Sequence, residues 1–273
     1  MKSKVMSNNV IDALLARFRT SSEPSKPEPS QWETPFAFPM EVHIVDKQDI
    51  FYKKGRVLAE HAYRRTWKTE NLLDGNDYAV VVSQKGTVIG NLNLQLRSKD
   101  KPLKSEMFFG QEHWQSYFNL GSTGVAEISA LAISHELPQE MSRPVMMLLI
   151  LGISSLCRLK EISLLATVQH EFLIRVLKQS LQMPFIWNEK VQTPSGKLPN
   201  DNYWNRKEPP KLYYLDTNSQ QAVSSCASFF WYLNALGIQT AFLPRVQTEE
   251  LTYATFRKSD KSRASLMSLN LAI

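Results

Sequence analysis

Cysteine is scarce in this chain of 273 residues: Cys157 and Cys226 are the two present, and each lies in an apolar segment. A domain held together by disulfides would need several cysteine pairs and would be typical of a secreted protein. A reactive thiol would need cations beside it, which these apolar segments lack. We therefore expect two reduced, buried thiols in a cytoplasmic protein.

Glycine is also infrequent, with 10 residues in the chain. The sequence lacks a P-loop, a G-x-G-x-x-G turn and a G-x-S-x-G elbow, which argues against a phosphate-binding loop and an ordinary serine hydrolase. The five histidines do not cluster, and neither His135–Glu136 nor His170–Glu171 is followed by a second histidine at helical spacing. We therefore expect no metal ion and no tightly bound cofactor.

Long uninterrupted hydrophobic runs are missing as well. Near the N-terminus, Asn8, Asn9 and Asp12 interrupt any apolar stretch that could act as a secretory signal. The most apolar segment, PVMMLLILGISSLC, lies between Arg143 and Arg158 and is shorter than the roughly 20 residues that cross a bilayer. We expect it to form a buried helix of a soluble protein.

The charge is moderately basic, with a formal net charge of +6. The sequence contains neither a dense Lys/Arg tract nor zinc-finger spacing, so nucleic-acid binding is not predicted. The surplus is either an ordinary solvated surface or a means of attracting an acidic protein partner.

Four segments are expected along the chain. Apolar residues at helical spacing predict an amphipathic helix within residues 1–20, and prolines at Pro24, Pro27 and Pro29 predict a linker over 21–40. The helix could pack on its own domain, on a partner or on a membrane surface. One α/β domain is expected over 41–217, followed by a C-terminal extension over 218–273 that begins with a helix.

Strands and helices alternate in the second half of the central domain, which predicts a mixed twisted sheet flanked by helices. Expected strands lie at 40–45, 77–84, 87–96, 125–134, 161–168 and 211–217, with helices at 50–68, 144–157, 170–181 and 225–236 and a loop at 135–144.

One carboxylate, Glu127, interrupts the otherwise apolar strand VAEISALAIS. An unpaired charge inside a sheet is unfavourable, so Glu127 either forms a structural ion pair with an arginine or serves chemistry in a cleft. Ser129 shares its face of the strand.

The strand of Glu127 and its neighbours resemble a known family. The hairpin DYAVVVSQKGTVIGNLNL, the segment KPLKSEMF and the strand AEISALAIS are similar in order and spacing to motifs of acyl-homoserine-lactone synthases and long-chain N-acyl amino acid synthases. Arg56, Tyr63 and Trp67 match an upstream pattern of these enzymes. Their fold is a variant of the GNAT fold, and the resemblance covers about the middle third of the chain. It implies an N-acyltransferase that uses a thioester donor.

The resemblance implies roles for several residues. Glu127 would act as base or polar anchor for the acceptor amine, with Ser129 beside it and Trp67 in the substrate site. The arginines that the family carries on these two strands are replaced by Asn93 and Ala130. We therefore expect an acceptor other than S-adenosylmethionine, such as an amino acid, which Asn93 would contact.

The remaining candidate contacts divide among acceptor, acyl chain and donor. Arg97 could bind an acceptor carboxylate, and Met146 and Met147 could line an acyl pocket. The loop HELPQEMSRP has no glycine and carries Glu136 and Glu140, which disfavours a pyrophosphate site and hence coenzyme A. An acyl carrier protein is the preferred donor. Its candidate contacts are Arg64, Arg65, Lys68 and Arg143.

Three functions therefore remain open from the sequence. The first is an N-acyltransferase that moves a fatty acyl group from an acyl carrier protein to a small amine. The second is the same fold with an acyl-CoA donor, and the third is a non-catalytic binding scaffold. The missing arginines favour the scaffold, whereas the retained Glu127 opposes it.

Overall fold

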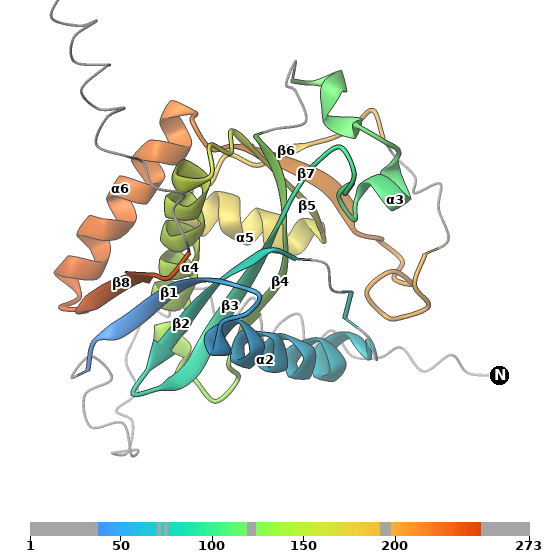
Figure 1. Ribbon diagram of the computed structural model, residues 1–273. Coiled ribbons are helices and arrows are strands. Elements are labelled where there is room, and N and C mark those ends of the chain that lie inside the picture. Colours follow the sequence, from blue (N-terminus) through green and yellow to red (C-terminus); the bar gives the residue numbers. More distant parts are fainter. Residues whose placement is uncertain (1–37, 70–71, 74–75, 119–123, 192–197, 247–273) are drawn as a thin grey trace, which may run out of the picture.

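The computed structural model describes residues 38–69, 72–73, 76–118, 124–191 and 198–246 (Figure 1). The expected N-terminal helix, most of the linker and the last part of the C-terminal extension lie outside these residues.

A single mixed sheet of eight strands, in the order β6-β7-β5-β4-β3-β2-β1-β8, organises the described residues. Pairs β4–β5 and β1–β8 are parallel, and the other neighbours are antiparallel. The predicted fold class, a mixed twisted sheet flanked by helices, is confirmed. The strands are β1 Met40–Asp46, β2 Tyr78–Gln84, β3 Thr87–Leu96, β4 Val125–Ile133, β5 Leu164–Gln169, β6 Ile186–Trp187, β7 Lys211–Asp216 and β8 Thr240–Pro244.

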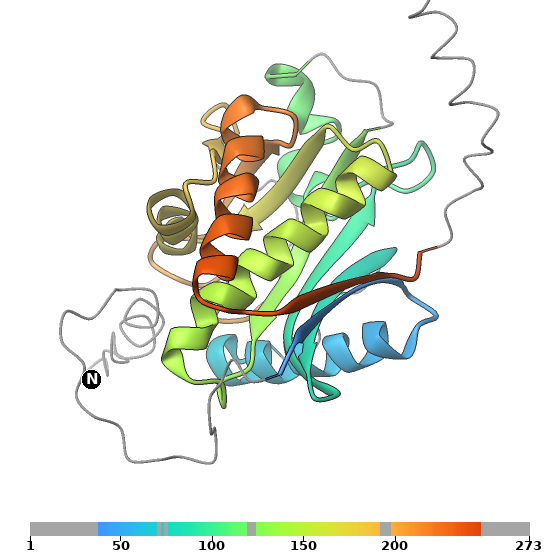
Figure 2. The same cartoon turned by 90° about the vertical axis from the view of Figure 1, so that its left-hand side faces the viewer.

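Helices cover both faces of the sheet (Figures 1 and 2). One face is covered by α2 (Ile50–Trp67), which contacts β3 and β4. On the other face, α4 (Gln139–Leu159) and α5 (Glu171–Leu181) enclose the larger hydrophobic core, and α6 (Gln220–Ala235) packs on α4. The short α3 (Glu106–Phe109) and a turn of 3-10 helix at His113–Ser116 lie between β3 and β4 in sequence.

Helix α4 starts earlier than the sequence predicts. The loop expected over 135–144 ends at Pro138, and the helix begins at Gln139. Met141 is fully buried in the core, so packing favours these extra residues although Pro144 cannot donate a backbone hydrogen bond. By length and composition α4 could cross a membrane, but 61% of its most apolar window is buried in this fold, as expected for a core helix.

The contact between α4 and the sheet depends on Gly152. A Cβ atom at this position would lie 2.3 Å from Val80 Cγ1 and 3.1 Å from Val42 Cγ1. We expect Gly152→Ala to destabilise the fold by about 1–3 kcal/mol through overpacking, despite the better helix propensity of alanine. Denaturant unfolding would measure this, with the exposed Leu159→Ala on the same helix as control. Equal stabilities of the Gly152→Ala variant and the parent would contradict the close packing of α4 on β2.

The expected C-terminal extension begins with two elements that join the domain. Helix α6 is capped by Ser219, whose side chain accepts a hydrogen bond from Ala222 N, and Gly237 follows the end of the helix with φ +71°. Strand β8 then pairs with β1 at the edge of the sheet. Strand β8 is not among the strands predicted from the sequence.

Candidate active site

The sheet opens between β4 and β5. The two strands pair at Val125, Ala126 and Glu127, and beyond these residues the pairing stops. In β4, Ala130 adopts a left-handed φ of +54°, and the register with β3 shifts at this point, as in a β-bulge. Because the bulge bends β4, its second half is directed away from β5.

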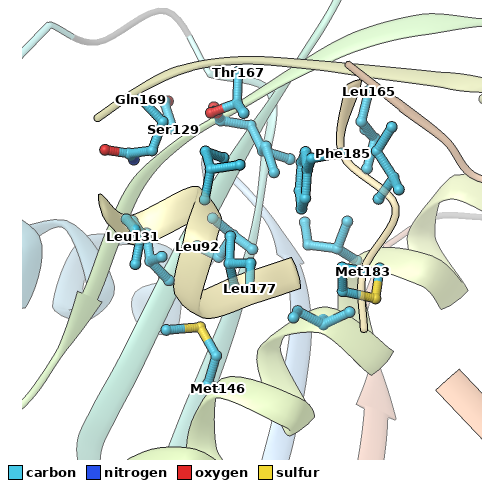
Figure 3. Close-up of a pocket in the computed structure, with 16 residues that line it drawn as sticks. Leu92, Ser129, Leu131, Met146, Leu165, Thr167, Gln169, Leu177, Met183 and Phe185 are labelled. Carbon is cyan, nitrogen blue, oxygen red and sulfur yellow. The ribbon is translucent and has the colours of Figure 1, made fainter. Parts of the chain in front are cut away.

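An apolar pocket with a cavity volume of about 40 Å³, partly open to solvent, lies where the strands separate (Figure 3). Its wall comes from β3, β4, β5, β7, α4, α5 and the segment after α5. Ser129, Thr167 and Gln169 supply the polar groups and lie together at one end (Figure 3). The apolar lining residues are Leu92, Ile128, Leu131, Met146, Ile150, Ile153, Leu165, Leu173, Ile174, Leu177, Met183, Phe185 and Leu215.

Of the two methionines proposed for the acyl chain, the structure places Met146 at the pocket wall and Met147 elsewhere in the hydrophobic core. Both side chains are buried.

A row of polar side chains lies on the face of the sheet that α2 covers. Across the β3–β4 pair, Asn93 is opposite Ser129 and Gln95 is opposite Glu127. Asn91 donates to Asn93 Oδ1 at 2.6 Å and to the carbonyl oxygen of Ala130 at 2.8 Å. The Asn93 side chain is fully buried, and its nitrogen has no hydrogen-bond partner among the described residues.

Glu127 is 4% exposed, and its hydrogen bonds come from Ser105. Its Oε2 accepts from the Ser105 backbone N–H at 2.8 Å and from the Ser105 hydroxyl at 2.6 Å. Burial raises the pKa of this carboxyl, and the Ser105 hydrogen bonds and the charge of Lys104 offset part of that rise. A carboxyl in this environment is suited to accept a proton.

Lys104 lies between Ser129 and Glu127. Its ammonium donates to Asn76 Oδ1 at 2.8 Å and to Ser129 Oγ at 3.2 Å, and its charge acts on Glu127. Ser129 lines the pocket, so the ammonium of Lys104 is one hydrogen bond away from a pocket-lining residue. The segment KPLKSEMF resembles a family motif, but nothing in its local pattern shows where it folds back, so the sequence does not single out this lysine.

Trp67 lies near the same end of the pocket. Its ring stacks on His170 at a centroid distance of 4.9 Å and meets Tyr203 edge-on at 5.2 Å. The Tyr203 hydroxyl is within hydrogen-bond distance of Val168 O (2.6 Å) and of Gln169 Oε1 (3.2 Å), which lines the pocket. The aromatic group thus forms a wall beside the polar end.

The Arg97 side chain interacts with other side chains of the protein. Its guanidinium forms ion pairs with Glu106 at 3.4 Å and Glu112 at 3.3 Å, and lies over the ring of Trp114. Two carboxylates already match its charge, which favours a bracing role over contact with an acceptor carboxylate. The arginine therefore braces the α3 segment and does not form a structural pair with Glu127.

The four proposed contacts to a carrier protein fall into two places. Arg64, Arg65 and Lys68 are exposed at the end of α2. Arg143 is on α4, where it donates to the carbonyl oxygen of Ser180 and lies 4.9 Å from the Tyr232 ring centroid. The first three can form one basic patch, whereas Arg143 is held against α5 and α6.

Among the residues that the structure describes, no three His, Cys, Asp or Glu side chains group so as to hold a metal ion. No known family model and no curated protein matches the sequence.

Several solved structures are similar to this chain in fold, and two of them are acyl-homoserine lactone synthases. The AHL synthase LasI shares 15% sequence identity, with a TM-score of 0.50 over 70% of this chain and 96% of that chain. A CoA-dependent acyl-homoserine lactone synthase, BjaI, whose structure contains SAM and isopentyl-CoA, shares 10% identity, with a TM-score of 0.51 over 76% of this chain and 94% of that chain. The resemblance predicted from the sequence is therefore confirmed at the level of the fold.

Proposed function

We propose that this protein is an N-acyltransferase that moves a fatty acyl group from a thioester to a small amine. The observation that carries the proposal is the apolar pocket between β4 and β5, whose polar end includes Ser129. Ser129 Oγ accepts a hydrogen bond from Lys104, whose charge acts on the buried Glu127. A pocket with one apolar and one polar end suits an acyl chain whose reactive carbonyl stops at the polar groups. The fold shared with two acyl-homoserine lactone synthases supports the same reaction class.

In this reaction, Glu127 serves as the base. As the amine nitrogen bonds to the thioester carbonyl carbon, the carbon–sulfur bond breaks, the amine gives a proton to the carboxylate, and the sulfur leaves as a thiol after taking up a proton. Ser129 lies two residues along β4 from Glu127, at roughly 7 Å, so an acceptor at the polar end of the pocket can reach both.

The preferred acceptor is an amino acid. Lys104 supplies a positive charge for a carboxylate, and the Asn93 amide supplies an unpaired hydrogen-bond donor. The amine of the same molecule can then lie toward Glu127. This assignment gives Lys104 the role that the sequence analysis expected of Arg97.

The preferred donor is an acylated carrier protein. The first turn of α4 carries Glu140, and the loop before it carries Glu136 and no glycine, so this helix start is a poor site for pyrophosphate. The exposed cations at the end of α2 suit an acidic carrier protein. An acyl-CoA donor is the second candidate, because the similar structure of BjaI contains isopentyl-CoA.

The test is acyl transfer by the purified protein. One arm compares acylated carrier protein with the same acyl group on coenzyme A, and a second compares an amino acid with the amine that lacks its carboxylate. Mass spectrometry is expected to find an N-acyl amino acid, formed faster from the carrier protein. Faster use of acyl-CoA would overturn the donor assignment, equal use of the two acceptors would overturn the role of Lys104, and no amide from any pair would overturn the acyltransferase.

A non-catalytic scaffold is the alternative that the low exposure of Glu127 favours. An acyltransferase and a scaffold differ in whether the pocket binds an acyl group. An acyl-pantetheine that enters it should raise the unfolding temperature by mass action, whereas a scaffold whose pocket is closed should show no shift.

A further inference from the structure

A buried chain of hydrogen bonds runs away from Glu127 and ends near the protein surface. Glu127 Oε2 bonds to Ser105 Oγ at 2.6 Å, and Ser105 Oγ bonds to His113 Nε2 at 2.8 Å. On the other side of the ring, His113 Nδ1 bonds to the Tyr214 hydroxyl at 2.8 Å, which accepts from Asn188 Nδ2 at 2.7 Å. All five side chains are buried, with at most 6% exposure.

The hydrogen bonds of Asn188, at the outer end of this chain, determine which group donates and which accepts at Tyr214. The backbone N–H of Lys190 donates to Asn188 Oδ1 at 3.1 Å, so the amide nitrogen of Asn188 is the atom that faces Tyr214. The Tyr214 oxygen therefore accepts from Asn188. Its own hydrogen is then directed to His113 Nδ1.

The tautomer of His113 in turn determines that Ser105 Oγ accepts a hydrogen bond from the ring. Burial lowers the pKa of His113 to about 4, so the ring is neutral near neutral pH and carries one N–H. Because Nδ1 accepts from Tyr214, that proton is on Nε2, which donates to Ser105 Oγ. The Ser105 hydroxyl then donates to Glu127, as the Ser105 backbone N–H also does.

We propose that Ser105, His113 and Tyr214 are positioning residues that hold Glu127 as an ionised base with its Oε1 atom left for the acceptor amine. The inference rests on the proposed acyl transfer and deepens it. Both donors from Ser105 meet Oε2, whereas Oε1 accepts no hydrogen bond from the described residues. One carboxylate oxygen is thereby anchored, and the other can take the proton without breaking the chain.

Other charged and titratable groups also act on Glu127. The positive charge of Lys104 favours the ionised carboxylate, and the negative charge of Glu106 opposes it. Tyr203, across the site, interacts electrostatically with Glu127 and stays protonated because burial raises its pKa. None of these three takes part in the hydrogen-bond chain, so a change in the His113 tautomer should reach Glu127 through Ser105.

Imidazole nitrogen NMR on the full-length protein with isotope-labelled histidines tests the chain directly. His113 is expected to be neutral, with the proton on Nε2. Tyr214→Phe removes the hydroxyl that fixes this tautomer and is expected to give a mixture of both tautomers. Tyr213→Phe, the neighbouring residue on the opposite face of β7, is the matched control and should change nothing. An imidazolium or an Nδ1–H tautomer in the parent, or an unchanged tautomer in Tyr214→Phe, would overturn the proposal.

The pH dependence of acyl transfer separates positioning from a merely structural role. When Ser105 no longer donates its hydroxyl hydrogen, ionised Glu127 becomes less favourable, and we expect the acid limb of kcat/KM in Tyr214→Phe to move up by roughly one pH unit. Tyr213→Phe should keep the parent profile. An unmoved limb in Tyr214→Phe would overturn the catalytic role. A parent protein with the expected tautomer and no transfer activity would instead refute the proposed function, so the two failures are distinguishable.

Discussion

Replacing Glu127 with glutamine is expected to reduce acyl transfer by about 10²- to 10⁴-fold, the range that a positioned general base contributes. The glutamine carbonyl oxygen can still accept the two hydrogen bonds from Ser105, so the fold should persist. Initial rates at saturating thioester, followed by mass spectrometry of the amide, would measure the loss. Glu136→Gln, an exposed carboxylate in the loop before α4, is the control and should retain the parent rate. A parent-like rate in Glu127→Gln would exclude the carboxylate as base.

The same substitution changes the pH dependence of stability. Burial raises the pKa of Glu127 above its ordinary value of 4.5, so the folded protein binds this proton more tightly than the unfolded chain. The contribution of Glu127 to the free energy of unfolding is therefore present at low pH and lost as pH rises through the raised pKa. In Glu127→Gln this decline should be absent, which denaturant unfolding across a pH series would show. The pH profile of the residual activity of Glu127→Gln should lack the acid limb that the ionisation of Glu127 gives the parent protein.

Ile150→Trp is expected to restrict the protein to shorter acyl chains. Ile150 lines the pocket from α4 and is partly exposed, so the larger ring can extend into the pocket without disrupting the core. Each buried methylene contributes about 0.8 kcal/mol, so excluding roughly four of them should lower kcat/KM for a long-chain thioester by about 200-fold. Short-chain thioesters should be used at close to the parent rate.

The control for this change is Leu159→Trp, on the same helix but exposed and outside the pocket lining. It should leave the preference for chain length unaltered. If Ile150→Trp reduced long and short chains equally, or reduced neither, the acyl chain would lie elsewhere.

Most elements of the sheet could be predicted because their signals are local. Asn93 and Gln95 are two residues apart in the strand expected at 87–96, and the structure shows them on one face beside Ser129 and Glu127. Helix α2 matches the prediction within one residue, since Asp49 caps its start and Lys68 adopts the left-handed conformation at its end. Strand β8 was missed because a short edge strand is stabilised by its pairing with β1, which no local pattern encodes.

The candidate site also has features that the sequence shows and features that depend on the tertiary structure. The sequence alone determined that one carboxylate, Glu127, stands in a buried strand, and that the strand belongs to a fold shared with acyl-homoserine lactone synthases. Only the tertiary structure decided what surrounds it. Ser105 binds the carboxylate across 22 positions of the chain, and His113 meets Tyr214 across 101. Such contacts depend on how the α3 segment folds back onto the sheet, and long-range packing, rather than local propensity, determines that path.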